Sequence, residues 1–190
     1  MITDVAQNIA DYLRKKNIIE QNKLDIYTYG FELMISNFIS VLVALIIGMI
    51  SSELIAVSIF MITFIMLRKF SGGYHADTYL KCNAFFALNV IIMIFLIKTI
   101  DSNNIWLHTA VCLIGLATIF ILSPIENINK PLNNIKRKKY KKFSLGILLF
   151  ITSISYILYI YKINYYLVLD ISIFSVSISM IIEKLRKENV

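Results

Sequence analysis

Apolar residues in this chain are gathered into six long runs separated by short polar segments. The runs lie at roughly 27–50, 51–67, 83–100, 105–124, 143–161 and 164–182. Runs of this length are typical of α-helices that cross a hydrocarbon core of about 30 Å. Two runs are short, since 54–67 and 84–97 each hold only about 14 residues, and re-entrant segments are the alternative there. Six crossings are favoured because the charges then fall into order.

The first 26 residues are mostly polar. Their apolar positions are Ile2, Val5, Ile9, Leu13 and Ile18. This spacing predicts an amphipathic helix at the membrane interface, although a solvated leader fits the thin stripe equally well. The position of the first apolar run does not suit a cleavable signal peptide. We therefore expect one membrane domain over 1–190, with an interfacial helix at 1–26, six transmembrane segments within 27–182 and a cytoplasmic tail at 183–190.

Composition supports an all-α, polytopic integral membrane protein. Hydrophobic residues make up 58% of the chain and charged residues only 16%, which excludes an ordinary soluble domain. The net charge of +7 comes from basic residues beside the apolar runs. Anionic lipid or an acidic peptide is therefore a better expected partner than nucleic acid.

The basic residues also predict the orientation in the cell membrane. If both termini are cytoplasmic, 17 of the 19 Lys and Arg residues lie in cytoplasmic segments, and only Lys98 and Lys162 lie outside. The cytoplasmic set is Arg14, Lys15, Lys16, Lys23, Arg68, Lys69, Lys81, Lys130, Lys136, Arg137, Lys138, Lys139, Lys141, Lys142, Lys184, Arg186 and Lys187. Such an excess of positive charge marks the inner side of a membrane protein.

One polar interval holds candidate chemistry, because His75 and Cys82 lie seven residues apart between two apolar runs. A thiol becomes a strong nucleophile when an imidazole takes its proton. On one straight helix the two side chains would stand about 10.5 Å apart along the axis, too far for proton transfer. Gly72 and Gly73 permit the chain to turn before His75.

A turn at this point would place the Cys82 thiol where its ionised form is stabilised. Asp77 or Thr78 can cap a helix that continues into the third crossing, which places Cys82 near a helix N-terminus that favours thiolate. Asp77 is more simply a solvated cap than a third catalytic group. Spacing by itself also allows a plain polar turn, in which His75 bonds the backbone and Cys82 packs as a small apolar residue.

The second cysteine and the remaining motifs indicate no further chemistry. Cys112 lies about 10 Å inside the outer end of the fourth crossing and Cys82 at the inner surface, so we expect two free thiols and an inert Cys112. The chain holds no His-Glu-x-x-His motif, no glycine-rich phosphate loop and no Gly-x-Ser-x-Gly motif. Neither a metal site nor a nucleotide cofactor is expected.

Two motifs resemble those of the AgrB (accessory gene regulator B) family of membrane peptidases, and the likeness extends over nearly the whole chain. The first motif is Arg68-Lys69-x-x-Gly72-Gly73-x-His75, followed by Cys82. The second motif is Ser123-Pro124-Ile125-Glu126-x-x-Asn129-Lys130-Pro131-Leu132. The resemblance implies His75 as general base and Cys82 as nucleophile, with Arg68, Gly72 and Gly73 supporting them.

The resemblance also implies a reaction and a substrate. A thiol protease of this family cleaves the acidic C-terminal tail from a short autoinducer precursor that carries an amphipathic leader. The cleavage forms a thioester on Cys82, and the peptide then cyclises to a thiolactone or lactone used in quorum sensing. A homodimer is a further implication of the family.

Two acids and one basic run have open roles. Glu32, at the cytoplasmic end of the first crossing, could orient His75, hold substrate or extend to the interface. Asp170 is expected to be a helix-packing or interfacial group far from the motif. The run of basic residues is expected to anchor anionic lipid, to capture an acidic precursor tail, or both. Its members are Lys136, Arg137, Lys138, Lys139, Lys141 and Lys142.

Two other functions compete with the peptidase. A small transporter would pass a peptide or ion by means of its intramembrane acids. A non-catalytic membrane scaffold would recruit a soluble partner through the basic run. Replacement of Cys82 distinguishes the peptidase from both rivals, since neither rival needs the thiol.

Overall fold

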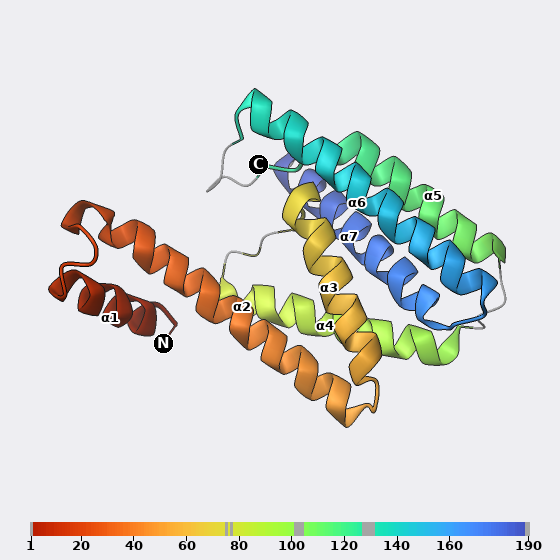
Figure 1. Ribbon diagram of the computed structural model, residues 1–190, viewed down its shortest axis with the longest axis horizontal. Helices are drawn as coiled ribbons and strands as arrows, with labels where there is room; N and C mark the ends of the chain where they lie inside the picture. Colours follow the sequence, from red (N-terminus) through yellow and green to blue (C-terminus); the bar gives the residue numbers. More distant parts are fainter. Residues whose placement is uncertain (1, 75, 77, 101–104, 127–131, 189–190) are drawn as a thin grey trace.

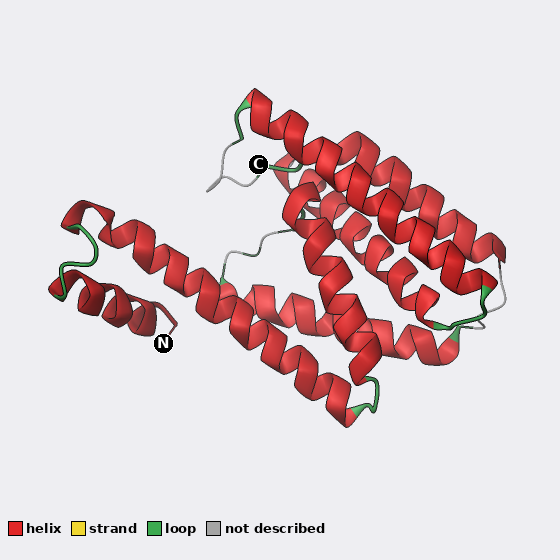
Figure 2. Ribbon diagram, viewed as in Figure 1, coloured by secondary structure: helices red, strands yellow, loops and turns green. Residues whose placement is uncertain are grey.

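The chain folds into α-helices, joined by short connections. The computed structural model describes residues 2–74, 76, 78–100, 105–126 and 132–188, and these residues contain no β-strand. The helices are α1 (Ile2–Lys15), α2 (Leu24–Ile50), α3 (Leu54–Ser71), α4 (Tyr79–Thr99), α5 (Ile105–Leu122), α6 (Asn134–Ile160) and α7 (Tyr165–Glu188), with a 3₁₀ turn at Gln21–Lys23 (Figure 2). The all-α prediction is confirmed.

Six of the helices, α2 to α7, are long and apolar enough to cross a membrane. The two short apolar runs lie in continuous helices, α3 with 18 residues and α4 with 21. Each helix therefore extends beyond its apolar run into polar residues at the ends. At 1.5 Å per residue, even α3 is about 27 Å long, so the re-entrant alternative is not needed.

Helix α7 lies at the centre of the arrangement. It packs against α3, α5 and α6, whereas α2 packs against α3, α4 and the N-terminal helix α1 (Figure 1). Along α7, hydroxyl side chains such as Ser172 and Ser177 are buried and donate to the carbonyls of Val168 and Ile173 one turn earlier. Small residues that satisfy their own hydroxyl groups let neighbouring helices approach closely.

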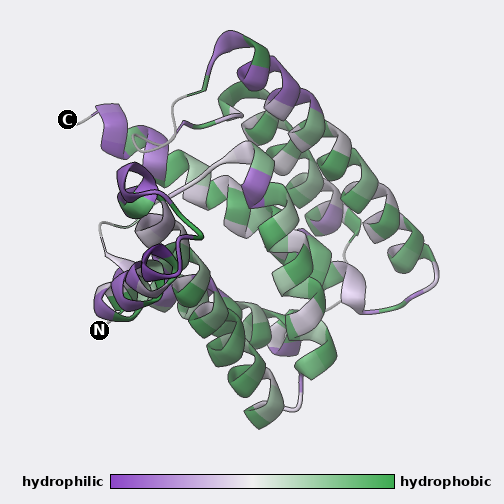
Figure 3. Ribbon diagram, turned by 60° about the vertical axis from the view of Figure 1, so that its left-hand side comes forward, coloured by the Kyte–Doolittle hydropathy of each residue, from purple (hydrophilic) through white to green (hydrophobic). Residues whose placement is uncertain are grey.

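The helices are joined by an aromatic and aliphatic core, while large apolar side chains also cover the outside. Phe60 and Phe64 of α3 meet Phe86 of α4 with ring centroids 5.5–6.4 Å apart. Outside, Phe38 is 62% exposed, and apolar residues colour most of the length of the long helices (Figure 3). An apolar exterior of this kind is suited to contact with the lipid chains of a membrane.

Helix α1 packs against α2 through small residues. Ala6 and Ala10 are fully buried, whereas Val5 of the predicted apolar side is 45% exposed. Ile18 lies beyond the helix, which ends at Lys15. An N-terminal helix is confirmed, but it ends at Lys15 and does not extend to residue 26, because a 3₁₀ turn and the start of α2 follow it. Its location at the membrane interface stays a prediction.

Candidate active site at the basic end of the bundle

The first motif forms the end of α3 and the turn that follows it. Gly72 has φ +80° and ψ −161°, and Gly73 has φ +146°. The Gly72 conformation is essentially restricted to glycine. A Cβ on Gly72 would also lie 2.3 Å from the carbonyl oxygen of Ile125. Both glycines are therefore required by the geometry, as the sequence predicts for a turn at this point.

This turn contacts the second motif. The Ile125 N–H donates to the Ser71 carbonyl oxygen over 2.9 Å, so Ile125 and Gly72 lie backbone against backbone. The second part of that motif, 127–131, lies outside the described residues. A Cβ on Gly73 would lie 2.6 Å from the Ser179 hydroxyl of α7. Two motifs about 50 residues apart and the central helix thus converge on one turn.

Arg68 connects this turn to the thiol. Its guanidinium donates to the Tyr74 carbonyl oxygen and interacts electrostatically with Cys82 and Glu183. It also lies over the Phe64 ring, 5.6 Å from the centroid. A planar guanidinium carries a permanent positive charge and several donors, so Arg68 can donate to a backbone carbonyl while its charge acts on Cys82 and Glu183.

Cys82 lies in the first turn of α4. Thr78 caps this helix, since its hydroxyl accepts from the Lys81 N–H at 3.3 Å, and Cys82 N–H donates to the Thr78 carbonyl at 3.1 Å. The Cys82 side chain is partly exposed. The predicted cap at Thr78 is confirmed. The positive end of the helix dipole and Arg68 both favour negative charge at this place.

The segment that precedes His75 is held against α4. The Tyr74 ring lies 5.2 Å from that of Phe85, three residues beyond Cys82. The chain between α3 and α4 is not helical where it is described, as the proposed dyad requires. His75 and Asp77 themselves lie outside the described residues, so their pairing with Cys82 stays a prediction.

Glu32 and its neighbours join α2 to the start of α4. The Tyr79 hydroxyl donates to Glu32 Oε2 over 2.8 Å. One turn further, Asn83 Oδ1 accepts from Ser36 and from Ser40 at 2.9 and 2.8 Å. Glu32 therefore positions the helix that carries Cys82, a role that the sequence did not suggest.

We expect Tyr79→Phe to lower the free energy of unfolding by about 1–2 kcal/mol, because it leaves a half-buried carboxylate without this donor. For a chain of this size that corresponds to a fall in Tm of roughly 2–8 °C. Thermal unfolding in detergent, followed by circular dichroism, measures it. Tyr27→Phe, at an exposed tyrosine of α2, is the matched control, and equal Tm values for both variants would contradict the assignment.

The basic run occupies the first turns of α6, and its members are exposed except for Lys141, which is partly buried. Asn133 caps this helix by accepting from the Lys136 N–H at 2.8 Å. Beside the run is an open hollow of about 410 Å³ between the second motif and the end of α7. Arg137 reaches Glu126 there at 3.9 Å. The basic run thus lies next to the second motif.

Tyr79, Ser179 and Glu183 were not predicted to belong to the site. Helical spacing could have indicated Ser179 and Glu183, since both belong to the buried face of α7. A buried carboxylate there needs a partner. Nothing in the local pattern distinguishes Tyr79 from an interfacial tyrosine. Cys82 and Cys112 are free thiols, as predicted.

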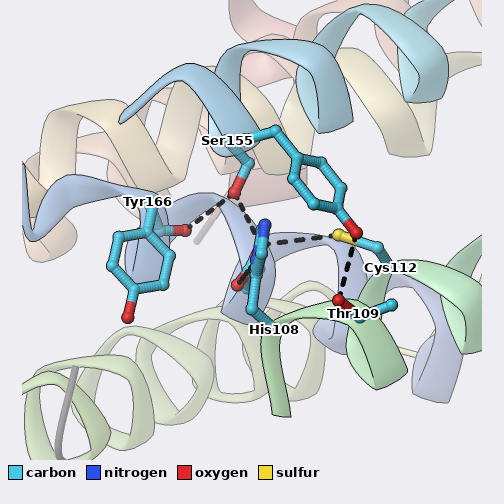
Figure 4. Close-up of polar contacts among 7 residues, drawn as sticks. His108, Thr109, Cys112, Ser155 and Tyr166 are labelled. Carbon is cyan, nitrogen blue, oxygen red and sulfur yellow. Dashed lines mark hydrogen bonds and ion pairs between the residues drawn. The ribbon is translucent and has the colours of Figure 1, made fainter. Parts of the chain in front are cut away.

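At the opposite end of the bundle, Asp170 meets His108 and Cys112, the last two of which are labelled in Figure 4. Asp170 Oδ2 lies 2.6 Å from His108 Nδ1. The carboxylate is 3% exposed, so Asp170 packs between helices and is not interfacial. It is remote from Cys82 along the bundle, as predicted.

Comparison with known proteins identifies the family. The accessory gene regulator B profile matches residues 6–182. The chain belongs to the AgrB family. It is 31% identical over 169 residues to AgrB-like protein 2 of Clostridium perfringens strain 13, covering 84% of this chain and 79% of that protein. Accessory gene regulator protein B of Staphylococcus aureus strain N315 is 25% identical over 147 residues, covering 76% and 78%. No solved structure matches.

The AgrB match begins within α1 and ends within α7, so it contains both motifs, all of α2 to α6 and most of α7. The resemblance inferred from the two motifs is confirmed at the level of the family. The six long apolar helices fit a multi-pass membrane protein.

Proposed function

We propose that this AgrB family member is a membrane cysteine endopeptidase that cleaves and cyclises a short signalling-peptide precursor for quorum sensing. One observation carries the proposal. Arg68 donates to the carbonyl of Tyr74, the residue before His75, and interacts electrostatically with Cys82 at the capped start of α4. The same side chain thus ties the candidate nucleophile to the segment that carries the candidate base.

In the proposed first step, His75 takes the Cys82 proton and the thiolate attacks a peptide carbonyl of the precursor. A C–S bond forms and the peptide C–N bond breaks. The departing amine takes the proton from the imidazolium and leaves with the C-terminal tail. The product is a thioester between the retained peptide and Cys82.

In the second step, a cysteine or serine side chain of the retained peptide attacks the thioester carbonyl. Its proton passes to His75, the bond to Cys82 breaks, and a thiolactone or lactone ring is released. With a cysteine the thioester is exchanged for another thioester, and with a serine it is converted to an ester. A site at the membrane edge, bordered by Phe64 and the Tyr74–Phe85 pair, limits the water that would otherwise hydrolyse the intermediate.

The other site residues have supporting roles in this proposal. Gly72 and Gly73 set the turn, Glu32 holds the start of α4 through Tyr79, and Arg68 supplies positive charge beside the sulfur. The exposed basic run at the start of α6 attracts an acidic precursor tail and anionic lipid. The distribution of basic residues supports a cytoplasmic location for both termini and for this site.

The direct test is reconstitution of the purified chain in liposomes with a precursor peptide encoded beside it. Mass spectrometry should show loss of the C-terminal tail and a retained peptide lighter by one water than its linear form. An uncut precursor, under conditions where the protein is folded and inserted, would reject the proposal.

We expect Arg68→Gln to lower the cleavage rate about 100-fold, because a charge-bearing donor at a reacting centre contributes roughly 10²–10³ in rate. Arg68→Lys keeps the charge but not the fork, so its rate should be intermediate. The neighbouring Lys69→Gln, at an exposed side chain, should change the rate less than about threefold. Equal losses in Lys69→Gln and Arg68→Gln would show a general charge effect instead.

A further inference from the structure

We propose that His108, Cys112 and Asp170 form a binding site for a divalent transition-metal ion of the Zn²⁺ class, within the membrane and separate from the candidate active site. His108 and Cys112 are one turn apart on α5, so both project from the same face of that helix. Asp170 comes from α7. A sulfur, a ring nitrogen and a carboxylate oxygen are the donor types that such ions take.

The donor atoms are already gathered. All three lie within 4.8 Å of one another, with 2.6 Å between His108 Nδ1 and Asp170 Oδ2 and 3.8 Å between Cys112 Sγ and Asp170 Oδ1. In a tetrahedral site, ligand atoms are separated by roughly 3.3–3.6 Å, given metal–ligand bonds of about 2.0–2.3 Å. Side-chain movements of about 1 Å would admit the ion.

The surroundings hold the ligands in place. Ser155 of α6 donates to Asp170 Oδ1 over 2.7 Å, and Figure 4 shows this hydroxyl directed at the cluster. The His108 ring is stacked on Tyr159 at 5.2 Å and meets the edge of Tyr156 at 4.3 Å. Its Nε2 atom has no hydrogen-bond partner within the described part of the chain. The ring is therefore anchored through Nδ1, on the side of the carboxylate and the thiol.

Charge balance favours an ion here. Ionised Asp170 and Cys112 with a neutral His108 carry two negative charges, which one divalent ion cancels. A neutral complex is the form that a low-dielectric interior accepts. Ionisable groups buried in a membrane bundle are costly and are by default functional. The three side chains are only 2–3% exposed.

The same geometry argues against a second nucleophilic site. The Cys112 thiol donates to the Asp170 carboxylate and not to the imidazole, so the stronger base is not paired with the sulfur. The cluster is therefore arranged for coordination rather than for acyl transfer. His108 is only about 5 Å along α5 from the end of the helix, so an ion can enter from that end.

Cobalt(II) is the probe of choice, because its coordination to a thiolate produces a charge-transfer absorption band in the near ultraviolet. The full chain, purified in detergent and stripped with chelator, should bind one Co²⁺ and develop this band. Since the chain has two cysteines, Cys82→Ser leaves Cys112 as its one thiol. The band should persist in Cys82→Ser, and Zn²⁺ should displace Co²⁺ and remove it. Cys112→Ser should lose the band and bind at least about 100-fold more weakly, as expected for loss of a direct ligand.

A matched pair of serines tests the arrangement around the site. Ser155→Ala removes the donor to Asp170 and should weaken Co²⁺ binding about tenfold. Ser153→Ala, whose hydroxyl donates to the Leu149 carbonyl of its own helix, should not change it. Absence of stoichiometric binding, or a band that is lost in Cys82→Ser, would overturn the proposal. The Cys82→Ser result decides the matter even if Cys112→Ser fails to fold.

Discussion

Replacing Cys82 with serine is expected to reduce cleavage of the precursor at least about a thousandfold, because no other group can form the acyl intermediate in the proposed mechanism. Serine is smaller than cysteine and fits the same partly exposed place, and the bond from Cys82 N–H to the Thr78 carbonyl involves only the backbone. The fold should therefore persist. The reconstituted protein and single-turnover product analysis measure the effect.

Asn89→Ala is the matched control for Cys82→Ser. Asn89 lies seven residues further along α4, on the same side of the helix, and donates to the Phe85 carbonyl of its own helix. Its replacement should leave cleavage within about threefold of the unaltered chain.

The same variant distinguishes the rival functions. A transporter would still move a peptide or ion after loss of the sulfur, and a scaffold would still recruit its partner. Undiminished processing in Cys82→Ser would therefore overturn the peptidase proposal. A loss in Cys82→Ser that Asn89→Ala matches would indicate damage to α4 instead of loss of a nucleophile.

Replacing Gly72 with alanine is expected to lower stability and activity together. The added Cβ would lie 2.3 Å from the Ile125 carbonyl oxygen, in a backbone conformation that costs a non-glycine residue about 1–3 kcal/mol. With the clash included, we expect a loss of at least about 2–3 kcal/mol. Because the turn holds the two motifs together, cleavage should fall at least tenfold even in the folded fraction.

Gly30→Ala provides the matched control. Gly30 lies in α2, with nothing within 4 Å of the position its Cβ would take, so alanine there should be neutral or stabilise the helix by about 0.5–1 kcal/mol. Thermal unfolding in detergent and the cleavage assay measure both variants. A Gly72→Ala protein with unchanged Tm and unchanged activity would show that the turn does not connect the two motifs.

Much of the candidate site could be inferred from local sequence. The Gly72-Gly73 pair predicted a turn, and Thr78 predicted the start of a helix with Cys82 in its first turn, because caps and turns depend on residues within a few positions. Contacts across helices were not predictable in this way. Tyr79 with Glu32 and Ile125 with Ser71 join residues 47 and 54 positions apart. Hydropathy does not encode which helices become neighbours.

The amino-acid sequence by itself determined that this is an all-helical chain with six membrane-length segments, because the length of an apolar run is a local property that the thickness of a bilayer selects. It also contained the motifs that indicate the AgrB family. Only the tertiary structure decided that α7 is the central helix, that Arg68 joins Cys82 to the turn, and that Asp170 meets His108 and Cys112. These arrangements depend on how helices pack, and packing between apolar helices is governed by side-chain shape and a few buried polar pairs rather than by hydropathy.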